Sequence, residues 1–134
     1  MSNENRPRHK EDSIKFLQSN IYEMGEKEQS DVASLGHPLY LKIDNKPRNK
    51  VGYLNFNIHY DKKKIIIWNI CLKEKWRGKK HGYRFISLLL DKAVEEGCEL
   101  AEADGADKNP HFWECLHFEK KIQQNEVTYI KKIK

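Results

Sequence analysis

The stretch that decides the fold reads LKEKWRGKKHGY and covers residues 72–83. It is basic, contains two glycines, and follows an apolar run at residues 64–72. After it, apolar residues recur at the i, i+3 and i+4 positions of an amphipathic helix: Phe85, Ile86, Leu89, Leu90, Ala93 and Val94. We therefore expect a buried strand, a short basic loop and a helix in direct succession.

This loop has the composition of an anion-binding site. The first turn of a helix has backbone N–H groups without intrahelical partners and a partial positive charge. Gly78 and Gly82 would let phosphates approach the backbone, and Arg77, Lys79 and Lys80 would add full charges. The segment therefore predicts a pyrophosphate cradle, and the alternative is a group of solvated surface charges. It is neither a Walker loop nor a dinucleotide fingerprint, because Gly-Lys-Ser/Thr and GxGxxG are absent.

Three strand patterns are found up to this loop, at residues 38–44, 51–60 and 64–72. The second alternates apolar and polar residues with a period of two, which indicates a half-buried strand. Because the links between the three are short, we expect antiparallel hairpins that form a meander.

Nearer the N-terminus, Ile14, Leu17, Ile21 and Met24 have helical spacing and predict an amphipathic helix over residues 13–25. Residues 26–36 are expected to form a loop. Residues 1–10 are expected to be disordered.

Beyond the central helix, the pattern predicts a strand at 98–103, a short helix at 110–116 opened by Asn109, and a hairpin of strands 118–122 and 127–132. The order of elements predicts an α/β (α+β) fold whose mixed sheet contains an antiparallel meander and is flanked by helices. A chain of 134 residues suits one core, so residues 11–134 are interpreted as a single domain.

Composition excludes several classes of protein. The longest apolar run, at residues 65–68, is too short to span a bilayer, and the N-terminus lacks the apolar core of a signal peptide. Three cysteines are too few for a disulfide framework, so we expect a cytoplasmic protein with no membrane contact.

Charge is unevenly distributed along the sequence. Residues 42–84 contain 13 basic and 3 acidic side chains, whereas residues 85–118 contain 2 basic and 8 acidic ones. This asymmetry suggests a site that holds an anion on one side and a cation on the other, although a solvated charged surface would look the same. The acidic half and the lack of a helix-turn-helix, zinc or RNP pattern argue against a nucleic-acid partner.

With these residues in view, the sequence resembles the GNAT N-acetyltransferase superfamily. Residues 76–82, WRGKKHG, resemble the family motif Gln/Arg-x-x-Gly-x-Gly/Ala, which follows the fourth strand. Lys75 stands in for Gln/Arg, and Lys80 replaces Gly/Ala. We expect Lys80 to keep its backbone N–H in a helical conformation, where a positive φ is not needed.

A second block agrees with this resemblance. Residues 109–119, NPHFWECLHFE, resemble the family's Asn-x-x-Ala-x-x-Phe-Tyr-x-x-x-Gly-Phe region. The two blocks and the meander cover roughly residues 38–134.

The resemblance implies acetyl-CoA as co-substrate, lying in an opening between the fourth and fifth strands of the family fold. The main chain around residues 70–72 would bind the pantetheine arm, and amides from Arg77 to Gly82 would bind the pyrophosphate. A primary amine, on a small molecule or a protein, would attack the thioester directly. The implied cofactor-binding residues are Ile70, Cys71, Leu72, Arg77, Gly78, Lys79, Lys80, His81, Gly82, Tyr83, Asn109 and Trp113.

Catalytic residues are harder to assign. Family members often protonate the departing thiolate with a Tyr at the position of Trp113, and an indole cannot do this. Tyr129 is a candidate substitute acid, or else a core residue. Four acidic residues could attract an amine or position a water molecule, or else form an acidic edge: Glu99, Glu102, Asp104 and Asp107. Of these, Glu102 is the catalytic candidate. The alternative function is a weak or inactive module of this fold that acts by binding CoA or a partner, and exposed strand edges would allow a homodimer.

No metal site is expected. His111, Cys115 and His117 lack a fourth ligand and match no structural zinc pattern. Cys71 is expected to be a small buried strand residue rather than a nucleophile.

Overall fold

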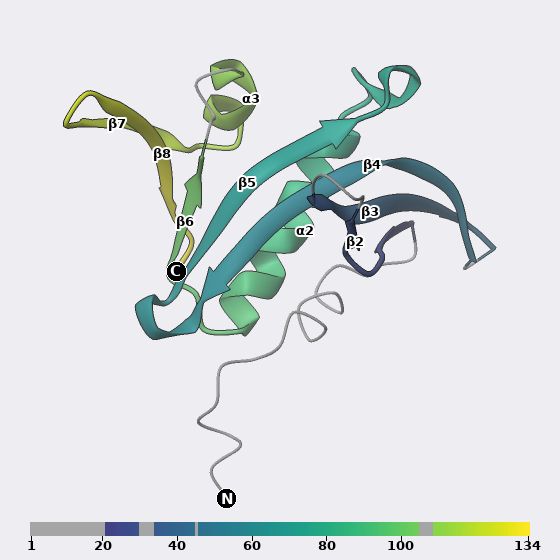
Figure 1. Ribbon diagram of the computed structural model, residues 1–134, viewed down its shortest axis with the longest axis horizontal. Coiled ribbons are helices and arrows are strands. Elements are labelled where there is room, and N and C mark those ends of the chain that lie inside the picture. Colours follow the sequence, from purple (N-terminus) through teal and green to yellow (C-terminus); the bar gives the residue numbers. More distant parts are fainter. Residues whose placement is uncertain (1–20, 30–33, 45, 105–108) are drawn as a thin grey trace, which may run out of the picture.

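The computed structural model describes residues 21–29, 34–44, 46–104 and 109–134 (Figure 1). Within them, a mixed sheet of eight strands forms the frame, in the order β1-β3-β4-β5-β6-β8-β7, with β2 paired to β3. The strands are β1 (Tyr22–Met24), β2 (Glu28–Gln29), β3 (Ser34–Ile43), β4 (Lys46–His59), β5 (Lys64–Leu72), β6 (Leu100–Ala103), β7 (Glu119–Gln123) and β8 (Glu126–Lys132). The helices are α2 (His81–Glu95) and α3 (Pro110–Cys115), with 3₁₀ turns η2 (Tyr60–Lys62) and η3 (Glu74–Trp76).

The predicted fold class is confirmed. Strands β3, β4 and β5 form the expected antiparallel meander. Strand β6 then pairs with β5 in parallel, from Lys64↔Leu100 to Ile67↔Ala103, after the chain has crossed over through α2. Strands β8 and β7 complete the sheet as an antiparallel hairpin on the far side of β6.

The core lies between the sheet and α2, which runs across one face of β4 and β5 (Figure 1). The apolar stripe predicted from the sequence supplies the buried side of the helix: Phe85, Ile86, Leu89, Leu90 and Ala93. It packs with buried residues of the strands, among them Leu54, Phe56, Ile65, Ile67 and Ala101. None of the helices in the described part of the chain is long and apolar enough to cross a membrane.

The expected helix at residues 13–25 is wrong for the part that the structure describes. Tyr22–Met24 is strand β1, which pairs antiparallel with β3. Tyr22 and Met24 are buried on either side of a less buried Glu23, whereas Ile21 is 57% exposed, so the local period is two. The expected loop at 26–36 also contains β2 and the start of β3. Residues 1–20, and with them the expected disorder of 1–10, lie outside the described residues.

Candidate active site at the split between β5 and β6

A β-bulge in β5 determines which side chains of this strand are exposed at the site. Phe56 of β4 pairs with Ile67 and Asn55 pairs with Asn69, so Trp68 is the extra residue on β5. A bulge of this kind reverses the side-chain alternation and bends the strand. Ile67 before the bulge is buried, while Trp68 and Asn69 at the bulge are exposed.

Strand β6 separates from β5 at the same point. The last parallel pair is Ile67↔Ala103, and the Asp104 N–H donates to the Ile67 carbonyl oxygen at 2.9 Å. Beyond it β5 continues to Leu72, whereas β6 ends at Ala103. A gap therefore opens beside the second half of β5.

Peptide groups of β5 face this gap. The Lys73 N–H donates to the Val51 carbonyl oxygen of β4 at 2.8 Å. Because antiparallel hydrogen bonding alternates along a strand, Cys71 also directs its peptide groups to β4, whereas Ile70 and Leu72 direct theirs to the opposite side. Of the three residues expected to bind through their main chain, Ile70 and Leu72 are thus oriented to do so.

The loop after β5 contains two residues in the left-handed conformation. Gly78 has φ +75°, which glycine adopts without strain. Lys80 has φ +67° and is the N-cap residue of α2, so the expectation that it would be helical is wrong. A side chain in this conformation costs roughly 1–2 kcal/mol.

The N-terminus of α2 opens onto the same gap. Its first intrahelical bond runs from the Arg84 N–H to the Lys80 carbonyl oxygen at 3.2 Å, and the Lys80 side chain makes no capping bond. The N–H groups of His81, Gly82 and Tyr83 therefore lie at the positive end of the helix without intrahelical acceptors.

The structure explains why residue 82 is a glycine, which the sequence alone did not. A Cβ there would lie 3.0 Å from Cε1 of Phe112, so this glycine lets α3 approach α2. Tyr83 stacks on the same Phe112 ring, with centroids 4.9 Å apart.

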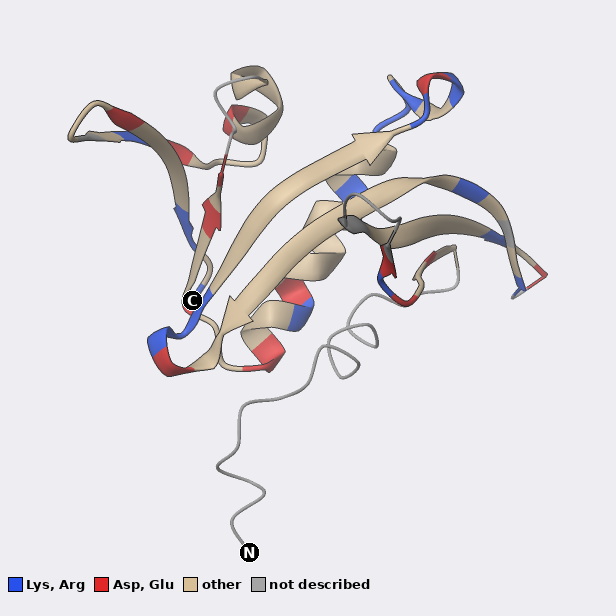
Figure 2. Cartoon of the chain, in the orientation of Figure 1, with Lys and Arg blue, Asp and Glu red and all other residues tan. Residues whose placement is uncertain are grey.

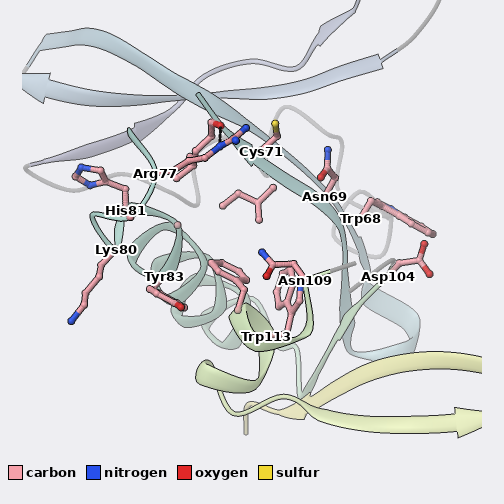
Figure 3. A pocket seen from close by; sticks show the side chains of 15 residues that line it. Trp68, Asn69, Cys71, Arg77, Lys80, His81, Tyr83, Asp104, Asn109 and Trp113 are labelled. Atoms are coloured by element: carbon pink, nitrogen blue, oxygen red, sulfur yellow. Dashed lines mark hydrogen bonds between the residues drawn. The ribbon is translucent and has the colours of Figure 1, made fainter. Parts of the chain in front are cut away.

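Together these elements enclose a cavity of about 660 Å³ (Figure 3). Its lining comes from β5, the basic loop, the start of α2 and α3: Trp68, Asn69, Ile70, Cys71, Leu72, Arg77, Gly78, Lys80, His81, Gly82, Tyr83, Asp104, Asn109, Phe112 and Trp113. All of the expected cofactor-binding residues are among them except Lys79, whose Nζ lies 5.9 Å from the centroid of the Trp76 ring.

The two candidate catalytic residues do not line the cavity. Tyr129 is 1% exposed in β8, opposite Ala103, and belongs to the core. The Glu102 carboxylate of β6 accepts a hydrogen bond from Lys64 Nζ at 3.1 Å. Their places are those of the alternatives considered above, a core residue and an acidic edge.

The expected cofactor-binding residues do not include four others that line the cavity: Trp68, Asn69, Asp104 and Phe112. The bulge that exposes the first two leaves no mark in the run KIIIWNICL. Asp104 is one of the acidic residues that the sequence suggested could attract an amine, and it directly follows the last residue of the parallel pair. Cys71 is exposed, contrary to expectation, because the bulge shifts it to the outer face.

The charged side chains that line the cavity differ in sign between its two ends. In Figure 3, Arg77, Lys80 and His81 lie at one end, and Trp68 and Asp104 lie at the other. Figure 2 shows Lys and Arg gathered on the loop after β5 and acidic residues on β6. The pKa of His81 is lowered by burial and then by the nearby Arg84 and Lys79 charges, so this imidazole favours its neutral form.

Aromatic residues form the wall on the α3 side. Trp113 is buried and makes edge contacts with the Phe112 and Phe118 rings. Burial raises the pKa of Tyr83, and a hydrogen bond with Cys115 adds to this. Cys115 Sγ also lies 3.4 Å from His111 Nε2. Within the described residues, no three His, Cys, Asp or Glu side chains are grouped to hold a metal ion.

This fold is a GNAT-like α/β architecture, and comparison with known proteins identifies the family. Residues 4–118 match the model of the Acetyltransferase (GNAT) family. The chain therefore belongs to the GNAT acetyltransferase family. No curated protein sequence matches it.

Solved structures share the fold at low sequence identity. A proposed N-acetyltransferase from Lactobacillus plantarum is 17% identical over 73% of this chain and 68% of its own, with a TM-score of 0.60. A GNAT-family acetyltransferase from Staphylococcus aureus Mu50 is 14% identical over 74% and 68%, with a TM-score of 0.58. PaiA N-acetyltransferase from Thermoplasma acidophilum, in complex with coenzyme A, is 15% identical over 70% and 58%, with a TM-score of 0.56.

Proposed function

We propose that the protein is an N-acetyltransferase that transfers the acetyl group of acetyl-CoA to a primary amine. The observation that carries this proposal is the cavity along the free side of β5, which ends at the uncapped N-terminus of α2 beside Arg77 and Lys80. Membership of the GNAT family supports it.

The residues present fit the cofactor. The N–H groups of the first turn of α2, with the Arg77 and Lys80 charges, suit a pyrophosphate. The Ile70 carbonyl and the Leu72 N–H suit the amides of a pantetheine arm, which would pair with β5 in the manner of a strand. The similar Thermoplasma acidophilum structure contains coenzyme A.

Acetyl-CoA would supply a thioester. The acceptor, once its ammonium form has lost a proton to water, would attack the thioester carbonyl carbon; the C–S bond would then break, and the departing thiolate would take up the second proton released by the nitrogen. The Ile70 N–H, which faces the gap and lies closer along β5 to Trp68 than Leu72 does, would donate to the oxygen that becomes negative during this attack. The Leu72 carbonyl accepts a hydrogen bond from Arg77 at 2.8 Å, and this contact fixes the orientation of the residue. The buried Trp113 would exclude water from one wall.

The test is isothermal titration with acetyl-CoA and with CoA, followed by a thiol-release assay against a panel of amines. Two neighbouring lysines provide a matched pair, because Lys80 lines the cavity and Lys79 does not. Lys80→Gly should weaken CoA binding by about tenfold, the effect of one charge-assisted contact, and Lys79→Ala should change it by less than about twofold. Absence of binding to both ligands would overturn the proposal.

A second candidate is a CoA-binding module with little or no transferase activity. Trp113 favours it, because this residue stands where relatives often have the Tyr that protonates the thiolate. Tight CoA binding, with no thiol release above background for any amine, would support this second function.

A further inference from the structure

The end of the cavity farthest from α2 is formed by Trp68 and Asp104. Each directly follows one member of the last β5–β6 pair, Ile67↔Ala103, so the two residues are neighbours across the split. Both line the cavity, and Figure 3 shows their side chains side by side at its end, away from Arg77 and His81.

The Trp68 indole is exposed and held in place. It is 45% exposed, and its Nε1–H donates to Asn57 Oδ1 at 2.6 Å. This bond uses the one polar group of the ring and limits its rotation. The ring therefore offers a ligand its apolar faces, whose negative electrostatic potential attracts cations.

The Asp104 carboxylate is exposed and has a free charge. In the described part of the chain, no Lys or Arg forms an ion pair with it. The neighbouring acids differ, because Glu102 pairs with Lys64 at 3.1 Å and Glu99 with Lys63 at 3.9 Å. Asp104 is thus the acidic group in the cavity lining whose charge is left to a ligand.

We propose that Trp68 and Asp104 form a subsite for an organic ammonium ion, and that this is how the acceptor amine is recognised. The role of this subsite in acceptor recognition rests on the proposed function. The subsite selects cationic acceptors, because a neutral acceptor would cover the carboxylate without compensating its charge. Arg77 and Lys80 at the other end repel the same cation, so the cavity fixes the orientation in which the acceptor enters.

The test uses choline as the probe and 3,3-dimethylbutan-1-ol as its neutral isostere. The two differ by a charged nitrogen in place of a carbon, and neither can be acetylated on nitrogen. Dissociation constants are measured by NMR from the backbone amide resonances of the cavity residues, which every variant keeps. The indole N–H resonance of Trp68, assigned by its loss in Trp68→Phe, reports the contact in the unmodified protein. We expect choline to bind about tenfold or more tightly than the alcohol, and to shift the Trp68 resonance.

Variants separate the two contributions. Trp68→Leu keeps an apolar side chain without the ring and should reduce the preference for choline severalfold, whereas Trp68→Phe should retain part of it. Asp104→Asn should also reduce it severalfold. The matched control is Glu102→Gln, two residues earlier but outside the cavity, which should leave the preference unchanged. Circular dichroism of each variant verifies that it is folded.

The same samples are titrated with CoA, so that failure of the subsite and failure of the proposed function are distinguishable. If CoA binds but choline shows no preference over the alcohol, the ammonium subsite is wrong and the proposed function stands. If choline is preferred but CoA does not bind, the subsite stands and the proposed function falls. If Glu102→Gln and Asp104→Asn lose the preference for choline equally, the preference arises from general surface charge, and the proposed subsite is wrong.

Discussion

Arg77 Nε donates a 2.8 Å hydrogen bond to the carbonyl oxygen of Leu72, five residues earlier in the chain. This bond joins the end of β5 to the basic loop across η3. It holds the loop against the strand at the mouth of the cavity and leaves the rest of the guanidinium for an anion. The strand that would bind one part of a CoA molecule and the loop that would bind another are therefore connected through a single side chain.

Arg77→Ala is expected to weaken CoA binding by more than tenfold, because it removes both a charge and the contact that positions the loop. Arg77→Lys restores the charge but not the planar guanidinium, so its affinity should be intermediate. Isothermal titration at low and high salt separates the two effects, since only the charge contribution is screened. An Arg77→Ala protein with the affinity of the unmodified chain would contradict this role.

Lys80 is expected to lower the stability of the fold while its charge strengthens CoA binding. Lys80→Gly should raise the free energy of unfolding by about 0.5–1 kcal/mol, because it removes the left-handed strain, while glycine's entropy in the unfolded chain offsets part of the gain. The same change should weaken CoA binding. Urea denaturation measures the first effect and calorimetry the second.

Lys80→Ala is the control for that pair of effects. It loses the charge but keeps a Cβ at φ +67°, so CoA binding should fall without a gain in stability. Equal stability of the glycine and alanine variants would show that the conformation of this residue costs nothing.

Gly52 is expected to be the least replaceable glycine near the cavity. It lies opposite Leu72 in the β4–β5 register, and a Cβ there would clash with the Cys71 carbonyl oxygen and lie 2.8 Å from Leu72 Cα. Both are backbone atoms and cannot rotate away as a flexible side chain could. Gly52→Ala should lower the free energy of unfolding by about 3 kcal/mol, measured by chemical denaturation.

Gly97→Ala is a suitable comparison. Gly97 has φ +98° but no atom within 4 Å of its would-be Cβ, so alanine there suffers backbone strain alone, about 1 kcal/mol. A loss at Gly52 no larger than the loss at Gly97 would mean that β4 and β5 can separate freely at the cavity.

Local patterns explain how much of this fold could be predicted. The run at residues 64–72 coincides with β5, and the apolar stripe from Phe85 to Ala93 faces the core as expected. Both depend on side-chain periodicity within one element, and this periodicity is visible in the sequence itself. The loop between them was recognisable because glycines and basic residues precede a helix, so most of the expected cofactor-binding residues line one cavity.

What could not be predicted depends on contacts between elements. The bulge at Trp68 arises from the register with β4, and it alone decides that Trp68 and Asn69 are exposed while Ile67 is buried. Tyr22–Met24 is a strand because β3 offers a partner, although Ile21 and Met24 also fit a helical spacing. Glu102 and Asp104 look alike in the sequence, and only the position of Lys64 shows which of them is already paired.

Stability is expected to depend on the ionisation of His81. Its pKa in the folded protein is below the ordinary 6.5, first because of burial and then because of Arg84 and Lys79. Above pH 6.5 the imidazole is neutral in both the folded and the unfolded chain, so the stability is fully present there. As the pH falls below 6.5 toward the folded pKa, the unfolded chain takes up the proton first, and stability is lost.

His81→Asn tests this dependence. His81 Nδ1 lies 3.1 Å from the Tyr22 hydroxyl, and an Asn carbonyl can accept the same bond without titrating. The midpoint of urea unfolding should fall less in His81→Asn than in the unmodified protein between about pH 7.5 and about pH 5.5. Parallel pH profiles for the two proteins would mean that His81 protonates equally easily when folded, and that the loss of stability in acid arises elsewhere.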